Sequence, residues 1–311
     1  MRLALMIEGQ EGVTWDDWQA LAATGTRLGY DALFRSDHYL SVDGVRERSA
    51  LDAWGTLCAL AATTRTIRLG TLVSPATFRH PSVLAKLAVT ADHVSGGRVE
   101  LGIGTGWNEP EHRAYGIPFP PLKVRMDRLA EQIEIVRRSW EEGPFSFSGE
   151  HWTVEDLDAL PKPVQRPPPL IMGGSAGPRS AALAARWADE YNVLHVDPQT
   201  AARSRDNLRA ACEAIGRDPA TLRLSMMNGF VIGADEADLR ARAERLAERQ
   251  GSPVDLDELA ASWIVGTPDR VIERLGEYAD AGVGRVMLQH HLFRDDEALE
   301  IISSDVMPAV A

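Results

Sequence analysis

Residues 98–116 read RVELGIGTGWNEPEHRAYG, an apolar run that leads straight into a Gly-Thr-Gly turn. The apolar run covers 99–103, and six groups able to bind or react follow the turn: Trp107, Asn108, Glu109, Glu111, His112 and Arg113. Glycines at a strand end let backbone N–H groups approach a ligand closely, and functional residues concentrate in loops held by a rigid scaffold. The sequence therefore predicts that this strand end borders a binding site.

Short apolar runs and helical patterns alternate along the rest of the chain. Eight runs are typical of strands: 3–7, 32–34, 67–73, 99–103, 170–172, 191–195, 222–232 and 285–289. Eight patterns are typical of helices: 14–28, 50–64, 81–94, 122–141, 178–187, 199–215, 235–250 and 268–281. This alternation predicts a parallel sheet with helices outside it, and eight repeats favour a closed (β/α)8 TIM barrel. An open doubly wound sheet is the alternative.

The interval between the fourth and fifth predicted strands is longer than the others and holds the helix 122–141 between two long loops. Long loops in a compact domain usually have a function. The second loop contains three aromatic residues that we expect to cover an apolar substrate: Phe145, Phe147 and Trp152. We therefore expect one domain over 1–311 with an insertion at roughly 105–168.

The composition excludes several functional classes. The 311 residues include 33 Lys and Arg against 45 Asp and Glu, a formal charge of −12, whereas nucleic-acid binding needs clustered basic residues. No apolar run approaches the ~20 residues that cross a bilayer, and the N-terminal run is too short for a signal peptide. Cys58 and Cys212 form neither a disulfide framework nor a metal-binding spacing. We expect a cytoplasmic protein that binds a small molecule and neither nucleic acid nor membrane.

Asp37 and His38 follow the second predicted strand. In a parallel barrel all strand C-termini lie on one face, where catalytic groups collect, and histidine titrates near neutrality. We therefore predict that His38 donates or accepts a proton and that Asp37 orients it. The alternative is a structural role in which the pair only caps a turn.

Polar side chains also follow other predicted strands. Glu8 ends the first strand, Gln289-His290-His291 end the eighth, and Asn192 or His195 of the sixth lies beside them at the predicted mouth of the barrel. Adjacent residues of a strand point in opposite directions, and no carboxylate or Cys spacing accompanies the two histidines, so we predict no metal. After the third strand, Arg79 is expected to be solvated.

Gly173-Gly174-Ser175-Ala176 lies between the fifth predicted strand and the next helix. A turn of this kind aims free N–H groups and the positive end of the helix at one point, which suits a phosphate. The alternative is that the glycines only reverse the chain.

These pieces together resemble the luciferase-like monooxygenase superfamily, and within it the branch of coenzyme F420-dependent oxidoreductases. The resemblance covers nearly the whole chain and is carried by the stretches 29–38, 67–71, 79–81, 95–109, 173–174 and 184–189. It implies a TIM barrel with a flavin-shaped ring at the strand C-termini. Family members are often dimers, so a homodimer is among the expected assemblies.

The resemblance also assigns candidate site residues. His38 matches the family histidine near the reactive carbon of the ring, with Asp37 beside it. Leu72 and Val73 match a non-prolyl cis peptide behind the ring. The cofactor-binding set expected from these matches is Glu8, Leu72, Val73, Ser74, Thr105, Gly106, Trp107, Gly173, Gly174, Ser175 and Ala176.

The expected function is hydride transfer between F420 and a small organic substrate. Some sugar-phosphate dehydrogenases of this branch carry a glutamate directly after Gly-Thr-Gly, where this chain has Trp107. Glu109 or Glu111 is the candidate replacement. The alternatives are an FMN-dependent monooxygenase that uses O₂, a flavin- or deazaflavin-binding protein without catalysis, and a metal-independent barrel lyase or hydrolase.

Overall fold

The computed structural model describes residues 1–311 and contains a closed barrel of eight parallel strands. In barrel order the strands are β1 (Arg2–Ile7), β2 (Ala32–Arg35), β3 (Arg68–Thr71), β5 (Val99–Gly104), β8 (Leu170–Gly173), β9 (Glu190–Leu194), β10 (Arg223–Ile232) and β12 (Val283–Gln289). The sheet closes because β9 pairs with β10, β10 with β12, and β12 with β1. All eight predicted strands are therefore confirmed, and the open sheet is excluded.

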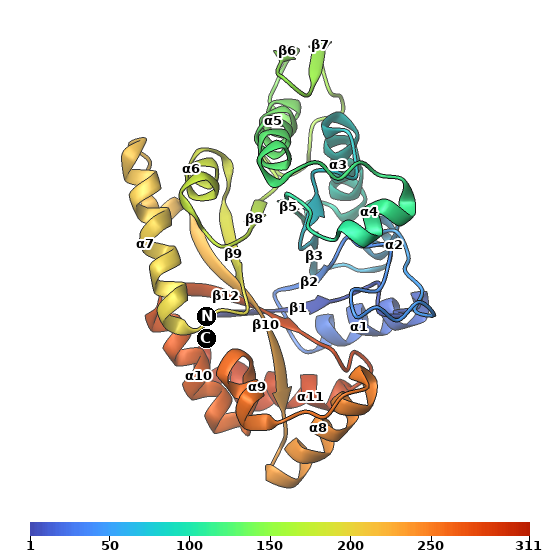
Figure 1. The fold of residues 1–311 in the computed structure, drawn as a ribbon, viewed down its shortest axis with the longest axis vertical. Helices are drawn as coiled ribbons and strands as arrows, with labels where there is room; N and C mark the ends of the chain where they lie inside the picture. Colours follow the sequence, from blue (N-terminus) through green and yellow to red (C-terminus); the bar gives the residue numbers. More distant parts are fainter.

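Eight helices surround the barrel (Figure 1). They are α1 (Trp15–Arg27), α2 (Ala53–Thr63), α3 (Pro81–Ser95), α5 (Leu122–Trp140), α6 (Pro178–Trp187), α7 (Pro198–Ala214), α8 (Glu236–Gln250) and α10 (Pro268–Asp280). Their starts follow ordinary capping chemistry: Thr14 and Asp17 form a reciprocal capping box at α1, and Asp235 accepts two N–H groups at α8. No helix is long and apolar enough to span a membrane.

Several short elements were absent from the sequence prediction. They are β4 (Ser74–Pro75), α4 (Glu109–Tyr115), β6 (Phe145–Ser148), β7 (Thr153–Leu157), the 3-10 helix η1 (Pro219–Thr221), α9 (Leu256–Ser262), β11 (Ile264–Gly266), α11 (Asp296–Ile301), the π-helix η2 (Ile302–Val306) and α12 (Met307–Val310). Two of these matter for function. The loop predicted after β5 contains α4, and the loop predicted after α5 contains the antiparallel hairpin β6–β7.

The hairpin changes one functional expectation. Phe145 and Val154 pack against Ile135 of α5, with Phe147 and Trp152 beside them. Figure 1 shows the hairpin projecting beyond α5, at the edge of the molecule. None of the three aromatic residues lines the cavity at the C-terminal ends of the barrel strands. The expectation that they cover a substrate is therefore wrong, because their rings anchor the hairpin to α5 instead.

The alternation of side chains along β1 explains how the barrel interior is layered. Leu3, Leu5 and Ile7 belong to the large apolar core that includes residues of the surrounding helices, whereas Ala4 and Met6 belong to a separate cluster of eight buried residues. Strand side chains point alternately to opposite faces, so this second cluster lies inside the barrel. Glu8 continues the inward series beyond the strand end and lines the main cavity.

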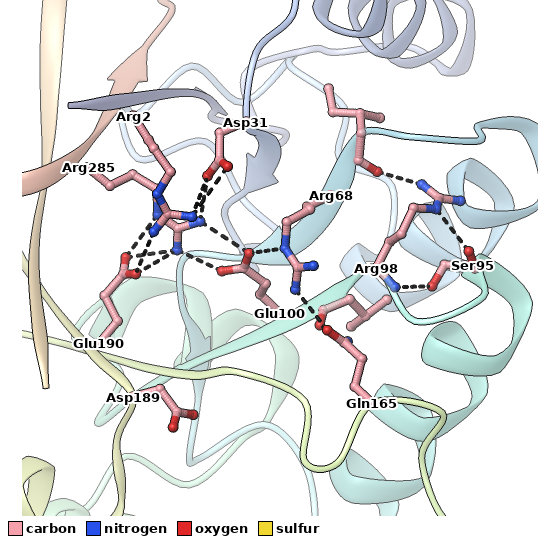
Figure 2. A network of polar contacts seen from close by, with 12 residues as sticks. Arg2, Asp31, Arg68, Ser95, Arg98, Glu100, Gln165, Asp189, Glu190 and Arg285 are labelled. Atoms are coloured by element: carbon pink, nitrogen blue, oxygen red, sulfur yellow. Dashed lines mark hydrogen bonds and ion pairs between the residues drawn. The ribbon is translucent and has the colours of Figure 1, made fainter. Parts of the chain in front are cut away.

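A buried ion-pair network lies at the opposite, N-terminal end of the strands (Figure 2). The guanidinium of Arg285, 1% exposed, lies 2.7 Å from Oε2 of Glu100 and 2.8 Å from Oε1 of Glu190. Arg68 also pairs with Glu100, at 2.5 Å. Burial alone would raise the pKa of Glu100, but Arg285 and Arg68 hold it at about 2. In TIM barrels the N-terminal face of the strands serves stability and the C-terminal face carries the active site. We therefore assign this network a structural role.

Candidate active site

A cavity of about 430 Å³ lies at the C-terminal ends of the barrel strands. Strand ends and the loops that follow them supply its lining: Glu8, Ser36, His38, Val42, Leu72, Val73, Pro75, Gly104, Thr105, Gly106, Trp107, Gly173, Gly174, Asn192, Leu194, His195, Met227 and Gln289. Nine of the thirteen predicted site residues are therefore brought together: Glu8, His38, Leu72, Val73, Thr105, Gly106, Trp107, Gly173 and Gly174.

One wall of the cavity is built from backbone and small apolar groups. The Leu72–Val73 peptide bond is cis, as the resemblance implies. Val73 fills the space beside two glycines: a Cβ on Gly104 would lie 2.7 Å from Cγ2 of Val73, and a Cβ on Gly173 would lie 3.2 Å from its Cγ1. Side chains at these glycines would displace Val73. The glycines therefore keep this wall free of side chains, so that a planar group can lie against it.

His38 is held by a carboxylate from outside the barrel strands. Its Nδ1 lies 2.8 Å from Oε2 of Glu111, which is fully buried on α4. The other oxygen of Glu111 accepts the backbone N–H groups of Tyr39 and Leu40. No protein atom hydrogen-bonds Nε2 of His38, so this nitrogen is available to a molecule in the cavity.

The charge of Glu111 also changes the acidity of the imidazole. Burial alone would lower the pKa of His38, but the hydrogen bond and the charge of Glu111 raise it above its ordinary value, with smaller contributions from Glu8 and Asp37. Burial alone would raise the pKa of Glu111, but His38 and two backbone N–H groups lower it. The contact therefore stabilises the protonated form of His38 beside the carboxylate of Glu111.

Asp37 makes no hydrogen bond to His38, so the prediction that it orients the imidazole is wrong. Its carboxylate is buried in a fork of Arg79, with Nη1–Oδ2 at 2.5 Å and Nη2–Oδ1 at 3.1 Å, and accepts the Ser74 hydroxyl at 2.7 Å. Consecutive residues point in opposite directions as the chain leaves a strand, so Asp37 faces away from the cavity. Arg79 is accordingly not solvated: only 10% of its side chain is exposed.

Ser74 does not line the cavity either. Its hydroxyl donates to Asp37 and accepts from the indole N–H of Trp54 at 3.1 Å, so its O–H donor is already used within the protein. Its place is structural, and it links the loop after β3 to the helix α2.

The Gly-Thr-Gly turn lies at the cavity, as predicted. Gly106 has φ +76°, a conformation that suits glycine, and its carbonyl accepts a hydrogen bond from Arg125. The next residue, Trp107, is 64% exposed, and its ring meets that of His38 edge-on with centroids 5.5 Å apart. Glu109, by contrast, is exposed in the first turn of α4 and does not line the cavity.

The glycine-rich turn after β8 contributes less than predicted. Gly173 and Gly174 line the cavity, but Ser175 is exposed and outside the lining. Ala176 is buried, and its N–H donates to the hydroxyl of Tyr191 at 2.9 Å. Ala176 therefore has no N–H left for an anion. The α6 N-terminus beyond it has no side-chain cap.

Glu8 and Gln289 form the polar side of the cavity. The Glu8 carboxylate accepts the amide N–H groups of Gln289 at 2.6 Å and of Gln10 at 2.8 Å. The Oε1 atom of Gln289 is buried without any hydrogen-bond partner. Because an unsatisfied buried acceptor is costly, this oxygen points to a bound donor group.

Asn192 and His195 both line the cavity, whereas His290 and His291 do not. No group of three or more His, Cys, Asp or Glu side chains in the structure is arranged to hold a metal ion.

Sequence reasoning missed Ser36, Val42, Pro75, Leu194 and Met227 in the lining, and it left the role of Glu111 open. Val42 lies in an irregular loop, and no periodic pattern marks its position. The only sequence signal for Glu111 is its density of polar neighbours in 107–113.

Comparison of the sequence with known proteins shows which protein family the chain matches. A family model described as luciferase-like monooxygenase matches residues 2–285. The chain is 29% identical over 321 residues to an F420-dependent glucose-6-phosphate dehydrogenase of Intrasporangium calvum, covering 91% of each chain. It is 30% identical over 306 residues to an F420-dependent hydroxymycolic acid dehydrogenase of Mycobacterium tuberculosis, covering 93% of this chain and 83% of that protein.

The chain is also similar to a monooxygenase and to a solved structure of an F420-dependent dehydrogenase. A pyrimidine monooxygenase of Stutzerimonas stutzeri is 33% identical over 221 residues, covering 69% of this chain and 58% of that protein. The structure of an F420-dependent secondary alcohol dehydrogenase in complex with an F420-acetone adduct superposes with a TM-score of 0.83 at 21% identity, with both chains fully covered. That likeness supports the barrel fold.

Proposed function

The chain belongs to the luciferase-like monooxygenase family, and from that premise we propose that it is an oxidoreductase that transfers hydride between coenzyme F420 and a small organic substrate. The observation that carries the proposal is the buried Glu111 contact of His38, which leaves one imidazole nitrogen facing a cavity at the C-terminal face of the barrel. Relatives that share about nine-tenths of the chain are F420-dependent dehydrogenases.

The lining suits a planar deazaflavin. Val73 and the backbone at Gly104 and Gly173 offer a wall without protruding side chains. At the polar side, the unpartnered Oε1 of Gln289 suits an N–H donor at the edge of a ring. The cofactor's phosphate would lie near Gly174 and the uncapped N-terminus of α6, where a helix attracts anions.

When bound, F420 supplies a hydride donor or acceptor at C5 of its ring, and the protein supplies binding and proton transfer. Nδ1–H of His38 donates to Glu111, so Nε2 is the atom that exchanges a proton with the substrate. In alcohol oxidation Nε2 of the neutral imidazole would take the hydroxyl proton, and the hydride of the carbinol carbon would go to the acceptor that bound F420 would supply. Glu111 stabilises the imidazolium that results. In the reverse direction the imidazolium returns the proton to the carbonyl oxygen.

A second candidate is an FMN-dependent monooxygenase that uses O₂. The observation that favours it is the pyrimidine monooxygenase relative, which has the higher sequence identity over a shorter stretch. A third reading, a flavin- or deazaflavin-binding protein without catalysis, is disfavoured by the His38–Glu111 pair, since binding alone does not need a buried proton-transfer group.

Hydride exchange under controlled oxygen separates these candidates. We expect reduced F420 to lose hydride to uncharged ketones, or oxidised F420 to gain it from secondary alcohols, at equal rates with and without O₂. An O₂-dependent reaction with reduced FMN and no exchange with F420 would support the monooxygenase. Binding of either cofactor without any exchange across such a panel would support the non-catalytic reading.

A further inference from the structure

We propose that the substrate of this protein is an uncharged molecule with an aromatic or otherwise apolar body, and that phosphorylated substrates are rejected. This inference rests on the proposed function, because it concerns the part of the cavity that a bound cofactor leaves to the substrate. It separates this chain from relatives that act on glucose 6-phosphate.

The first argument is the charge of the lining. No Lys or Arg is among the eighteen lining residues, and the single carboxylate among them is Glu8. Both oxygens of Glu8 already accept hydrogen bonds, and the donors are neutral amides. A phosphate in the part of the cavity that is left to the substrate would therefore find no lysine or arginine on the lining.

Two arginines that bind a lining residue or the neighbour of one are already engaged in other contacts. Arg79 is bound to Asp37 and also pairs with Asp52. Arg125 donates to the carbonyl of Gly106 and lies over the ring of Phe119 at 3.9 Å. Using either for a substrate would break existing contacts.

Arg48, on the loop that follows Val42, is held by Glu11 and Asp43. The imidazolium of His38 does not replace these arginines as a phosphate partner, because Glu111 already balances its charge.

An anion without a partner is expensive to bring into such a cavity. Removing a charged group from water costs several kcal/mol unless a counter-charge and hydrogen bonds replace the lost hydration. Phosphate recognition usually relies on arginine or lysine for this reason. The lining offers neither, so an uncharged substrate is favoured over its phosphorylated counterpart.

The second argument is the apolar rim. Trp107 is 64% exposed and Leu194 is 50% exposed, although both line the cavity, and Val42 lies on the lining with them. Large exposed apolar side chains at a cavity mouth are typical of a binding surface. The Trp107 ring already packs edge-on against His38, so a flat apolar substrate that contacts this indole is brought to the proton-transfer group.

Calorimetric titration of the F420-loaded protein with a matched probe pair tests the inference. β-Naphthol and β-naphthyl phosphate share one ring system and differ in charge, and neither can donate hydride. We expect the phenol to bind at least about ten-fold more tightly, the factor that corresponds to a difference of about 1.4 kcal/mol. Trp107→Ala should weaken β-naphthol binding by about ten-fold, and Trp107→Phe should preserve most of it.

A variant that adds a positive charge to the lining makes the test independent of any loss of folding. Leu194→Lys places a cation on the lining and should strengthen β-naphthyl phosphate binding by about ten-fold. Ile215→Lys, at an exposed site at the end of α7 outside the cavity, is the matched control and should change neither affinity.

The possible outcomes are distinguishable. Equal or tighter binding of the phosphate ester to the unmodified protein would overturn the inference and leave the cofactor assignment intact. Failure of the protein to take up F420 or FMN, seen in the loading step itself, would overturn the proposed function and this inference with it.

Discussion

Nδ1 of His38 lies 2.8 Å from Oε2 of Glu111, and this contact joins the end of β2 to a helix 73 residues further along the chain. The carboxylate is fully buried and also holds two backbone N–H groups of the loop that carries His38. The insertion after β5 therefore contributes to the site by fixing an imidazole that belongs to another strand.

Glu111→Gln should lower the pKa of His38, because it removes the charge that raises it. A pH profile of F420 turnover should then show its histidine inflection at lower pH. The rate at pH 7 should fall by about ten-fold or more, since acid–base catalysis contributes about 10²–10⁴-fold. The matched control is Asp37→Asn, which breaks the Arg79 pair and should reduce thermal stability without moving the inflection. An inflection moved by Asp37→Asn instead would contradict the assignment.

His38→Ala should reduce the turnover number by about 10²–10⁴-fold and leave F420 affinity largely unchanged, because His38 acts on the substrate's proton. His38→Gln is the companion variant, since it keeps a donor for Glu111 but cannot shuttle a proton. Steady-state kinetics and fluorescence titration separate the two effects. Unchanged turnover in both variants would remove His38 from the mechanism.

Gly104→Ala should weaken cofactor binding, because the new Cβ would lie 2.7 Å from Cγ2 of Val73 and would push that side chain out of place. Overpacking of this kind costs about 1–3 kcal/mol, or about ten-fold or more in affinity. Gly276→Ala in α10 is the control: nothing lies within 4 Å of the added methyl, so stability should rise by about 0.5–1 kcal/mol with affinity unchanged. Equal affinities for all three proteins would contradict the placement of the cofactor against this wall.

Glu100→Gln should destabilise the barrel by about 3 kcal/mol at pH 7, because it leaves part of the Arg285 and Arg68 charge uncompensated (Figure 2). Glu100 has a pKa depressed from 4.5 to about 2, so its stabilising contribution is complete above about 4.5 and is lost as the pH falls towards 2. Urea unfolding at neutral and at acid pH should therefore show the difference between parent and variant shrinking in acid. A difference independent of pH would show that Glu100 contributes through packing.

The sequence predicts the scaffold well because its signals are local. Every barrel strand and every surrounding helix follows from apolar periodicity and capping residues such as Thr14, and strand polarity alone places Glu8, His38 and Trp107 on one face. The contacts between loops are different. Whether His38 meets Asp37 or Glu111 depends on how the insertion folds back, and no periodicity in the sequence encodes that path.

The same reason explains two of the other errors. The sequence predicts a solvated Arg79 because the partner of this side chain, Asp37, lies 42 residues away in the chain. The sequence likewise predicts a free N–H at Ala176, because the hydroxyl that accepts this N–H belongs to Tyr191 on the next strand. In both cases a distant side chain uses a group that the local pattern leaves open.

The most direct test of the account is a titration of the purified protein with F420 and, separately, with FMN, following the fluorescence of each ring. Saturable binding of F420, at least about ten-fold tighter than that of FMN, is the predicted result. Tight binding of FMN without binding of F420 would contradict the assignment of a deazaflavin to the cavity beside His38.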